Sequence, residues 1–239
     1  MRYAKGFFDL QLAFARAVVD SAGLSFAQAL MDYTNLYIRF GLGRAFDPEH
    51  PGWQEYLAGL REAQDHSAWT YHFYCQHPDG MAAPAVVARF GCFAYGRLSD
   101  DRIRLHFENA ETDGRSPLAM ECRRRRRLEL AALFAHVQDT AGDAVRVVGA
   151  SWLYNLDAYR CLFPEPYLAT AHVLPRRFRH MPLWGQFLDR RGEIREKAAC
   201  EFRDRLAGLS SAESADQCFP LPVLGLEAPA RVFYAVYGA

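Results

Sequence analysis

The sequence predicts an α+β fold in which a mixed, mainly antiparallel sheet has helices on both faces. Three observations predict it: a helical apolar period near the amino terminus, three consecutive strand-type segments, and a later succession of helix, strand and helix. The chain has 239 residues, of which 51% are hydrophobic, so it can bury a large core. We expect one α+β domain over residues 1–239, with a helical layer (1–66), a sheet core (67–190) and carboxy-terminal helices (191–239).

The first 66 residues are predicted to be helical. Apolar residues recur regularly from Phe7 to Val19. Ser25 is a suitable N-cap for a second helix, which Gly41 and Gly43 end. The spacing of apolar residues between positions 53 and 60 indicates a third helix.

Strand-type segments follow this helical layer. We expect strands at Trp69–Cys75, Val86–Tyr95 and Arg102–Glu108, because these segments are rich in aromatic and β-branched residues or alternate strictly. The residues of His77–Pro84 are typical of a turn. Short connections between three strands predict an antiparallel meander.

The second half of the chain is predicted to mix helices and strands. The expected elements are a helix at Leu118–Val137, a strand at Val145–Leu153, a short helix at Leu156–Leu162, strands at Tyr167–Leu174 and Leu183–Leu188, and an amphipathic helix at Glu193–Leu206. A segment rich in proline and leucine, FPLPVLGL, and an aromatic stretch at Val232–Tyr237 complete the chain.

Composition excludes several classes of protein. A formal net charge of zero argues against a dedicated nucleic-acid binder. No apolar run reaches the ~18 residues that a membrane span needs, and the first 20 residues lack the pattern of a signal peptide. The six cysteines form no CxxC pair, which favours reduced thiols in the cytoplasm over a zinc site or a disulfide scaffold. The sequence is compatible with a homodimer.

The order of elements is similar to that of the GNAT acyltransferase superfamily over about Gly23 to Leu188. The segment NLDAYRCLF (Asn155–Phe163) also resembles that superfamily's Asn, Ala and Tyr pattern. The resemblance implies that the strands Arg102–Glu108 and Val145–Leu153 are neighbours that part toward their carboxyl ends. It further implies that a coenzyme A thioester lies between them and donates its acyl group to a small-molecule amine.

One loop departs from the family pattern. The superfamily's pyrophosphate loop is Q/R-x-x-G-x-G/A, whereas Asn109–Pro117 has a single glycine and the acids Glu111 and Asp113. We expect these acids to repel a pyrophosphate. The alternative is therefore a non-enzymatic binding or interaction protein that keeps the architecture without the cofactor.

Three side chains are candidates for catalysis. His106 and Glu108 share the polar face of their strand, where one of them could remove the proton of an amine nucleophile. The alternative is that these two polar residues lie on an exposed strand face and have no catalytic role. Tyr159 is a candidate acid for the departing thiolate, as is Tyr154, although tyrosines in such segments commonly only pack.

The candidate cofactor-binding residues are Arg115, Arg123, Arg126 and Arg127. On a regular helix the last three share a face, and arginine makes forked contacts with phosphate. The competing interpretation of the run Arg123–Arg127 is a solvated helix surface.

The candidate substrate-binding residues are Ser151, Asn155 and Gln186. We expect Ser151 and Asn155 to line a pocket that His106 faces, with Trp152 in the core, because polar groups at the end of a buried strand commonly build small-molecule sites. A third hypothesis is a metal-assisted enzyme using His106 and the acidic loop. No metal is expected under the acyltransferase hypothesis.

Overall fold

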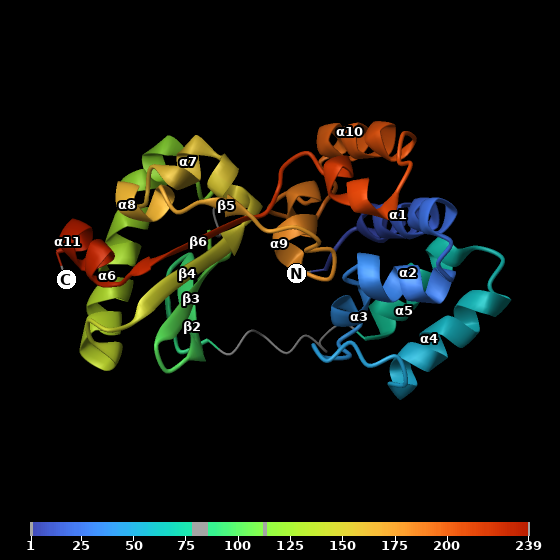
Figure 1. The fold of residues 1–239 in the computed structure, drawn as a ribbon, viewed down its shortest axis with the longest axis horizontal. Coiled ribbons are helices and arrows are strands. Elements are labelled where there is room, and N and C mark those ends of the chain that lie inside the picture. Colours follow the sequence, from blue (N-terminus) through green and yellow to red (C-terminus); the bar gives the residue numbers. More distant parts are fainter. Residues whose placement is uncertain (1, 78–85, 112–113, 239) are drawn as a thin grey trace. The chain divides into compact units, whose positions relative to one another are not determined.

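The computed structural model describes residues 2–77, 86–111 and 114–238 (Figure 1). Helices and a six-stranded mixed sheet form in this part of the chain, so the predicted α+β class is confirmed. Contacts group the chain into two compact units, a first one of Met1–Ala82 and Pro175–Pro222 and a second one of Ala83–Leu174 and Val223–Ala239. These borders differ from those expected at residues 66 and 190, because the segment after Leu174 packs on the amino-terminal helices.

The first unit is helical. Its elements are α1 (Lys5–Ala22), α2 (Phe26–Tyr33), α3 (Leu36–Arg39), α4 (Pro51–Glu62), α5 (His66–Gln76), α9 (Met181–Trp184), η3 (Gly185–Phe187), α10 (Glu196–Leu206) and η4 (Ala212–Cys218). Phe14 of α1 lies at the centre of its aromatic core, with ring centroids 5.7 Å from Trp184, 5.6 Å from Phe202 and 5.2 Å from Phe219. The aromatic residues of the carboxy-terminal segment thus complete the helical layer.

Two segments of the first unit that were expected to be strands are helices in the structure. The expected strand Trp69–Cys75 lies in α5, where the Asp65 carboxylate accepts the N–H groups of Ser67 and Ala68 as the helix cap. Phe73 and Tyr74 are buried against other helices, so packing outweighs their strand propensity. The expected strand Leu183–Leu188 lies in α9 and η3, with proline in the first turn of α9.

Three other predictions for this unit are confirmed, but the second helix ends at Tyr33 and Leu36–Arg39 form the separate helix α3 before Gly41. The Ser25 side chain accepts the N–H of Gln28 and caps α2. The third helix is α4, and the amphipathic helix is α10. The turn expected at His77–Pro84 falls almost entirely outside the described residues, as does Asp113.

The second unit holds the sheet. Its elements are β1 (Ala88–Phe90), β2 (Phe93–Ser99), β3 (Arg102–Phe107), η1 (Met120–Cys122), α6 (Arg123–Ala141), β4 (Arg146–Ser151), η2 (Trp152–Asn155), α7 (Asp157–Arg160), α8 (Glu165–Leu168), β5 (His172–Val173), β6 (Leu224–Pro229) and α11 (Arg231–Tyr237). The strand order is β1-β2-β3-β4-β6-β5, in which only β3 and β4 are parallel (Figure 1). The sheet is therefore mixed and mainly antiparallel, as predicted.

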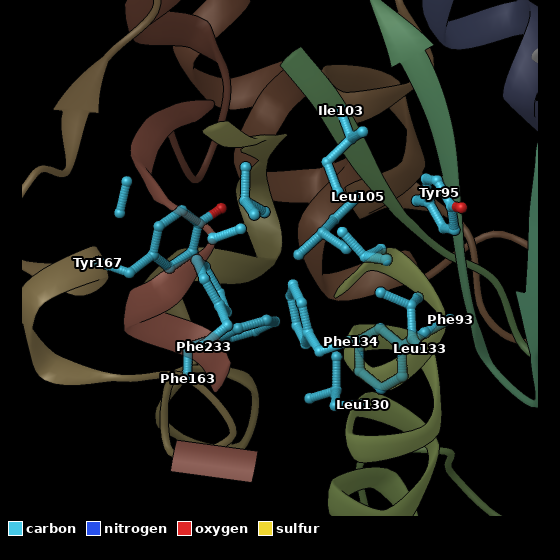
Figure 2. Packing of buried hydrophobic residues seen from close by; sticks show 14 of the residues in the cluster. Phe93, Tyr95, Ile103, Leu105, Leu130, Leu133, Phe134, Phe163, Tyr167 and Phe233 are labelled. Atoms are coloured by element: carbon cyan, nitrogen blue, oxygen red, sulfur yellow. The ribbon is translucent and has the colours of Figure 1, made fainter. Parts of the chain in front are cut away.

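The core of this unit lies on one face of the sheet. Ile103 and Leu105 of β3 pack there with Leu130 and Phe134 of α6 and with Phe233 of α11. Figure 2 shows Phe134 directed toward Phe233, and their ring centroids are 4.4 Å apart. The helices α6, α7, α8 and α11 all contribute to this cluster, so they cover the same face.

The strand boundaries differ from the expected ones in three places. The segment Val86–Tyr95 holds two strands, because Gly91 (φ 57°) and Cys92 form a tight turn between Phe90 and Phe93. The expected strand Tyr167–Leu174 is a helical turn followed by the two-residue strand β5. The strand β6 lies within residues 191–239, where carboxy-terminal helices were expected, whereas α11 is a helix in that part of the chain.

Candidate functional site

The strands β3 and β4 separate along their length. They pair in parallel at Arg102–Arg146, Ile103–Val147 and Arg104–Val148, and no pairing follows, although each strand continues for three more residues. Beyond this point β4 stays paired with β6 to its end at Ser151. The carboxyl-terminal halves of two neighbouring parallel strands thus have facing edges with no strand partner between them, as the resemblance implied.

The predicted catalytic residues His106 and Glu108 lie away from the core. Ile103 and Leu105 of β3 are buried in the core, so alternation directs the half-buried His106 to the opposite face of the sheet. Glu108 is exposed and forms an ion pair with Arg89, at 2.8 Å. The same alternation puts Ser151 of β4 on the core face with Val147 and Gly149, so the structure does not bring Ser151 and His106 together.

Tyr159 lies on the core face, beside the gap between β3 and β4. Its ring centroid is 5.3 Å from that of Phe107 at the end of β3, and 5.1 Å from that of Tyr154. The Tyr154 hydroxyl is 2.8 Å from the hydroxyl of Tyr167. Burial, and next the neighbouring Tyr154, raise the pKa of Tyr159 well above its usual value, so the phenol keeps its proton at neutral pH.

The predicted substrate-binding residues are not gathered in one place. Ser151 accepts the N–H of Leu153 and caps η2, and the Asn155 side chain donates to the carbonyl of Trp152. Trp152, expected in the core, is only half-buried, because the chain turns into η2 after Ser151 and buries Tyr154 instead.

Gln186 belongs to the first unit. Its amide nitrogen donates to the carbonyls of Leu183 and Leu221, and its amide oxygen accepts the N–H of Leu221. It is 2% exposed, so its placement is that of a buried structural residue. Trp184 lies in the aromatic core of the same unit.

Arg126 is directed into the protein. Its side chain is 1% exposed, and its Nη2 lies 2.5 Å from Glu111 and 2.8 Å from Glu129. Its Nη1 donates to the thiol sulfur of Cys92. Both ends of the guanidinium fork are thus engaged by protein groups, which makes Arg126 a structural ion-pair residue in this conformation.

The same contacts change the expected character of the acidic loop. The Glu111 side chain is only 5% exposed and also forms an ion pair with Arg125, at 2.9 Å. Arg125 and Arg126 therefore balance the charges of Glu111 and Glu129, and the expected repulsion of a pyrophosphate by Glu111 is largely removed. Burial raises the pKa of the Cys92 thiol, against the lowering effect of Arg126.

Arg123 and Arg127 line a shallow surface hollow of about 540 Å³ between α6 and α11. Both are exposed, and neither has an ion-pair partner in the parts of the chain that the structure describes. The full lining is Met120, Arg123, Arg124, Arg127, Leu128, Ala131, Val236 and Tyr237. Unpaired cations beside apolar side chains suit an anion that also has an apolar or aromatic part.

Sequence reasoning missed several residues of this hollow. Arg124 and Leu128 lie on α6, and Tyr237 of α11 donates a hydrogen bond to the carbonyl of Leu162, three residues after Tyr159. The helical period could have separated the arginines, since Arg126 lies one turn before the buried Leu130 and therefore faces the core. No local signal could have placed α11 beside α6.

The remaining candidate cofactor-binding residue is Arg115. It is exposed and interacts with other groups of the protein.

A second, smaller hollow lies in the first unit. Its volume is about 230 Å³, and it is lined by Arg205, Gly208, Leu209, Ser214, Gln217 and Cys218. Neither this hollow nor the larger one is lined by His106, Ser151, Asn155 or Gln186.

The described residues hold free cysteines, but neither a metal-binding cluster nor a membrane-spanning helix. In residues 2–77, 86–111 and 114–238, no three or more His, Cys, Asp or Glu side chains gather in a way that could hold a metal ion. The six cysteines are all free thiols. None of the helices in the described residues combines the length and the apolar character that crossing a bilayer requires.

Comparison with known proteins adds no further assignment. No protein-family model matches the chain, and no curated protein and no solved structure is significantly similar to it. The placement of side chains described above is therefore the basis for a functional proposal.

Proposed function

We propose that the second unit transfers an acyl group from a coenzyme A thioester to the amine of a small molecule, as its resemblance to the GNAT superfamily implies. The observation that carries the proposal is the pairing of β3 with β4, which stops after three residue pairs. Strand edges without a partner expose N–H and C=O groups that need hydrogen bonds. The amide groups of a pantetheine arm are suitable partners for them.

The nucleotide end of coenzyme A carries a diphosphate and a 3′-phosphate. Arg123 and Arg127, with Arg124, supply three exposed guanidinium groups in the hollow at the start of α6. Arginine binds phosphate through forked, charge-assisted hydrogen bonds. The proposal leaves out Arg126, whose two terminal nitrogens are engaged by Glu111, Glu129 and Cys92.

The chemistry needs one proton to leave the amine and one to reach the sulfur. The amine nitrogen attacks the thioester carbonyl carbon, so a C–N bond forms, the C–S bond breaks and the thiolate of coenzyme A takes up a proton. Tyr159 fits the acid role best, because it is protonated and lies beside the end of β3. His106 and Glu108 stay the predicted bases, although they lie on the other face of the sheet.

The runner-up function is a non-enzymatic binding protein. It is favoured by the aromatic packing of Phe107, Tyr159 and Phe163 beside the gap, which resembles an ordinary core. Incubation with acetyl-coenzyme A and a panel of primary amines separates the two functions. Release of free thiol that requires an amine supports the transferase, whereas coenzyme A binding without thiol release supports the binding protein.

Calorimetric titration of coenzyme A at low salt tests the arginine assignment. We expect the double variant Arg123→Ala/Arg127→Ala to lose about 100-fold in affinity, because each charge-assisted hydrogen bond contributes about 1.5–3 kcal/mol. Arg231→Ala is the matched control, since Arg231 is an exposed arginine of the same unit outside the hollow. Equal affinity in the double variant and the wild type would show that the hollow does not bind the nucleotide.

The remaining parts of the proposal follow from composition. We place the protein in the cytoplasm, because all six cysteines are free. The partner is a small molecule, with no nucleic acid and no membrane, and a homodimer stays open. Coenzyme A is the acyl donor, and the proposal includes no metal.

A further inference from the structure

Arg39 of α3 is a buried cation in the helical unit. Only 6% of its surface is exposed. Its Nη1 donates to the hydroxyl of Tyr3, at 3.0 Å, and its guanidinium carbon lies 5.4 Å from the centre of the Tyr3 ring. These are contacts with neutral groups, so they leave the positive charge uncompensated.

No carboxylate balances Arg39 in the described parts of the chain. No salt bridge to it is formed there, and its Nε is buried without a hydrogen-bond partner. Burial lowers the pKa of Arg39, and the nearby Arg44 lowers it further. Arg126 is even more deeply buried and its Nε also has no hydrogen-bond partner, but two carboxylates balance its charge, and this is the difference from Arg39. A buried charge without a partner is costly, so such positions commonly mark a site for an ion of opposite charge.

Two phenolic hydroxyls lie beside this guanidinium. Tyr3 and Tyr74 are stacked, with ring centroids 6.3 Å apart. The Tyr3 hydroxyl accepts a hydrogen bond from Arg39, and the Tyr74 hydroxyl accepts the backbone N–H of Tyr3, at 3.1 Å. Each hydroxyl can still donate one hydrogen bond, and no acceptor for either is found in residues 2–77, 86–111 and 114–238.

We propose that Arg39, Tyr3 and Tyr74 form a binding site for a small oxyanion, a phosphate or a carboxylate group. An oxyanion supplies the negative charge that Arg39 lacks and the acceptor oxygens that the two hydroxyls need. Arg44 is exposed and close enough to affect Arg39, so it adds positive charge near the site. The site lies entirely in the first unit and is independent of the proposed acyl transfer in the second unit.

Thermal unfolding of the full chain at constant ionic strength tests this site. Sodium phosphate and sodium acetate replace sodium chloride in two separate titrations, so that the phosphate and carboxylate sources are distinguished. We expect at least one anion to raise the melting temperature by about 2–4 °C when it saturates the site. The same titration should have no effect on Arg39→Met, which keeps the apolar stem and removes the charge.

Two further variants make the outcome decisive. Arg61→Met removes an exposed arginine of the same unit and should keep the full response. Tyr3→Phe should weaken the response, because it removes one hydroxyl. A wild type that responds to neither anion, or an Arg39→Met variant that responds as the wild type does, overturns the proposal.

Discussion

Arg126→Met is expected to destabilise the protein by about 3–5 kcal/mol at neutral pH. The substitution removes the cation that lies between Glu111 and Glu129, whose side chains are 5% and 11% exposed. Two carboxylates then remain in a buried region with only the more exposed Arg125 beside them. Urea unfolding of the full chain, followed by far-ultraviolet circular dichroism, measures the loss.

The neighbouring arginine is the matched control for this prediction. Arg123 is on the same helix but is exposed in the surface hollow, so Arg123→Met should leave the free energy of unfolding nearly unchanged. Adding Glu111→Gln and Glu129→Gln to Arg126→Met should restore part of the stability, because neutral amides cost less to bury. A loss below about 1 kcal/mol for Arg126→Met would mean that the ionic cluster contributes little to the fold.

Gly149→Ala is the second substitution with a large expected effect, a loss of about 3 kcal/mol. Gly149 lies in β4 at the point where β4 leaves β3. A Cβ atom at this position would overlap the buried hydroxyl oxygens of Tyr154 and Tyr167, which are hydrogen-bonded to each other. The methyl group therefore forces both tyrosines to move within a closely packed core.

Removing the two hydroxyls tests this explanation. The triple variant Gly149→Ala/Tyr154→Phe/Tyr167→Phe should recover part of the stability that Gly149→Ala loses, because the two nearest overlapping atoms are gone and, of the three nearest atoms, only the Cζ of residue 154 stays within 3.0 Å of the added Cβ. Gly208→Ala is the control, since a Cβ there meets only one atom, at an ordinary contact distance. If the triple variant is no more stable than the single one, the hydroxyls are not the cause of the loss.

The architecture of the second unit follows largely from sequence patterns. Alternation in Arg102–Glu108 correctly assigned Ile103 and Leu105 to the core and His106 to the other face. The α+β class and the neighbouring positions of β3 and β4 were predicted from the order of elements. The helix α5 was predicted as a strand, because its aromatic composition gives the wrong signal when the Asp65 cap and the packing of Phe73 are ignored.

The site was less predictable than the fold. Five consecutive arginines look alike in the sequence, and their roles differ because α6 turns Arg126 toward Glu111 and leaves Arg123 in the hollow. Glu111, one of the two carboxylate partners of Arg126, is 15 residues away, and Tyr237 is more than 100 residues from the arginines of the hollow, so neither position has a local signature. Ser151 and His106 were expected to face each other, but strand alternation in two separate elements puts them on opposite faces.

A crystal structure of the protein with coenzyme A tests the central proposal most directly. The account predicts phosphate oxygens within hydrogen-bonding distance of Arg123 and Arg127, and a pantetheine arm along the unpaired edges of β3 and β4 beyond Arg104 and Val148. It also predicts that Arg126 keeps its contacts with Glu111 and Glu129. Coenzyme A bound elsewhere, or no bound coenzyme A at millimolar concentration, would contradict the assignment of the second unit as an acyltransferase.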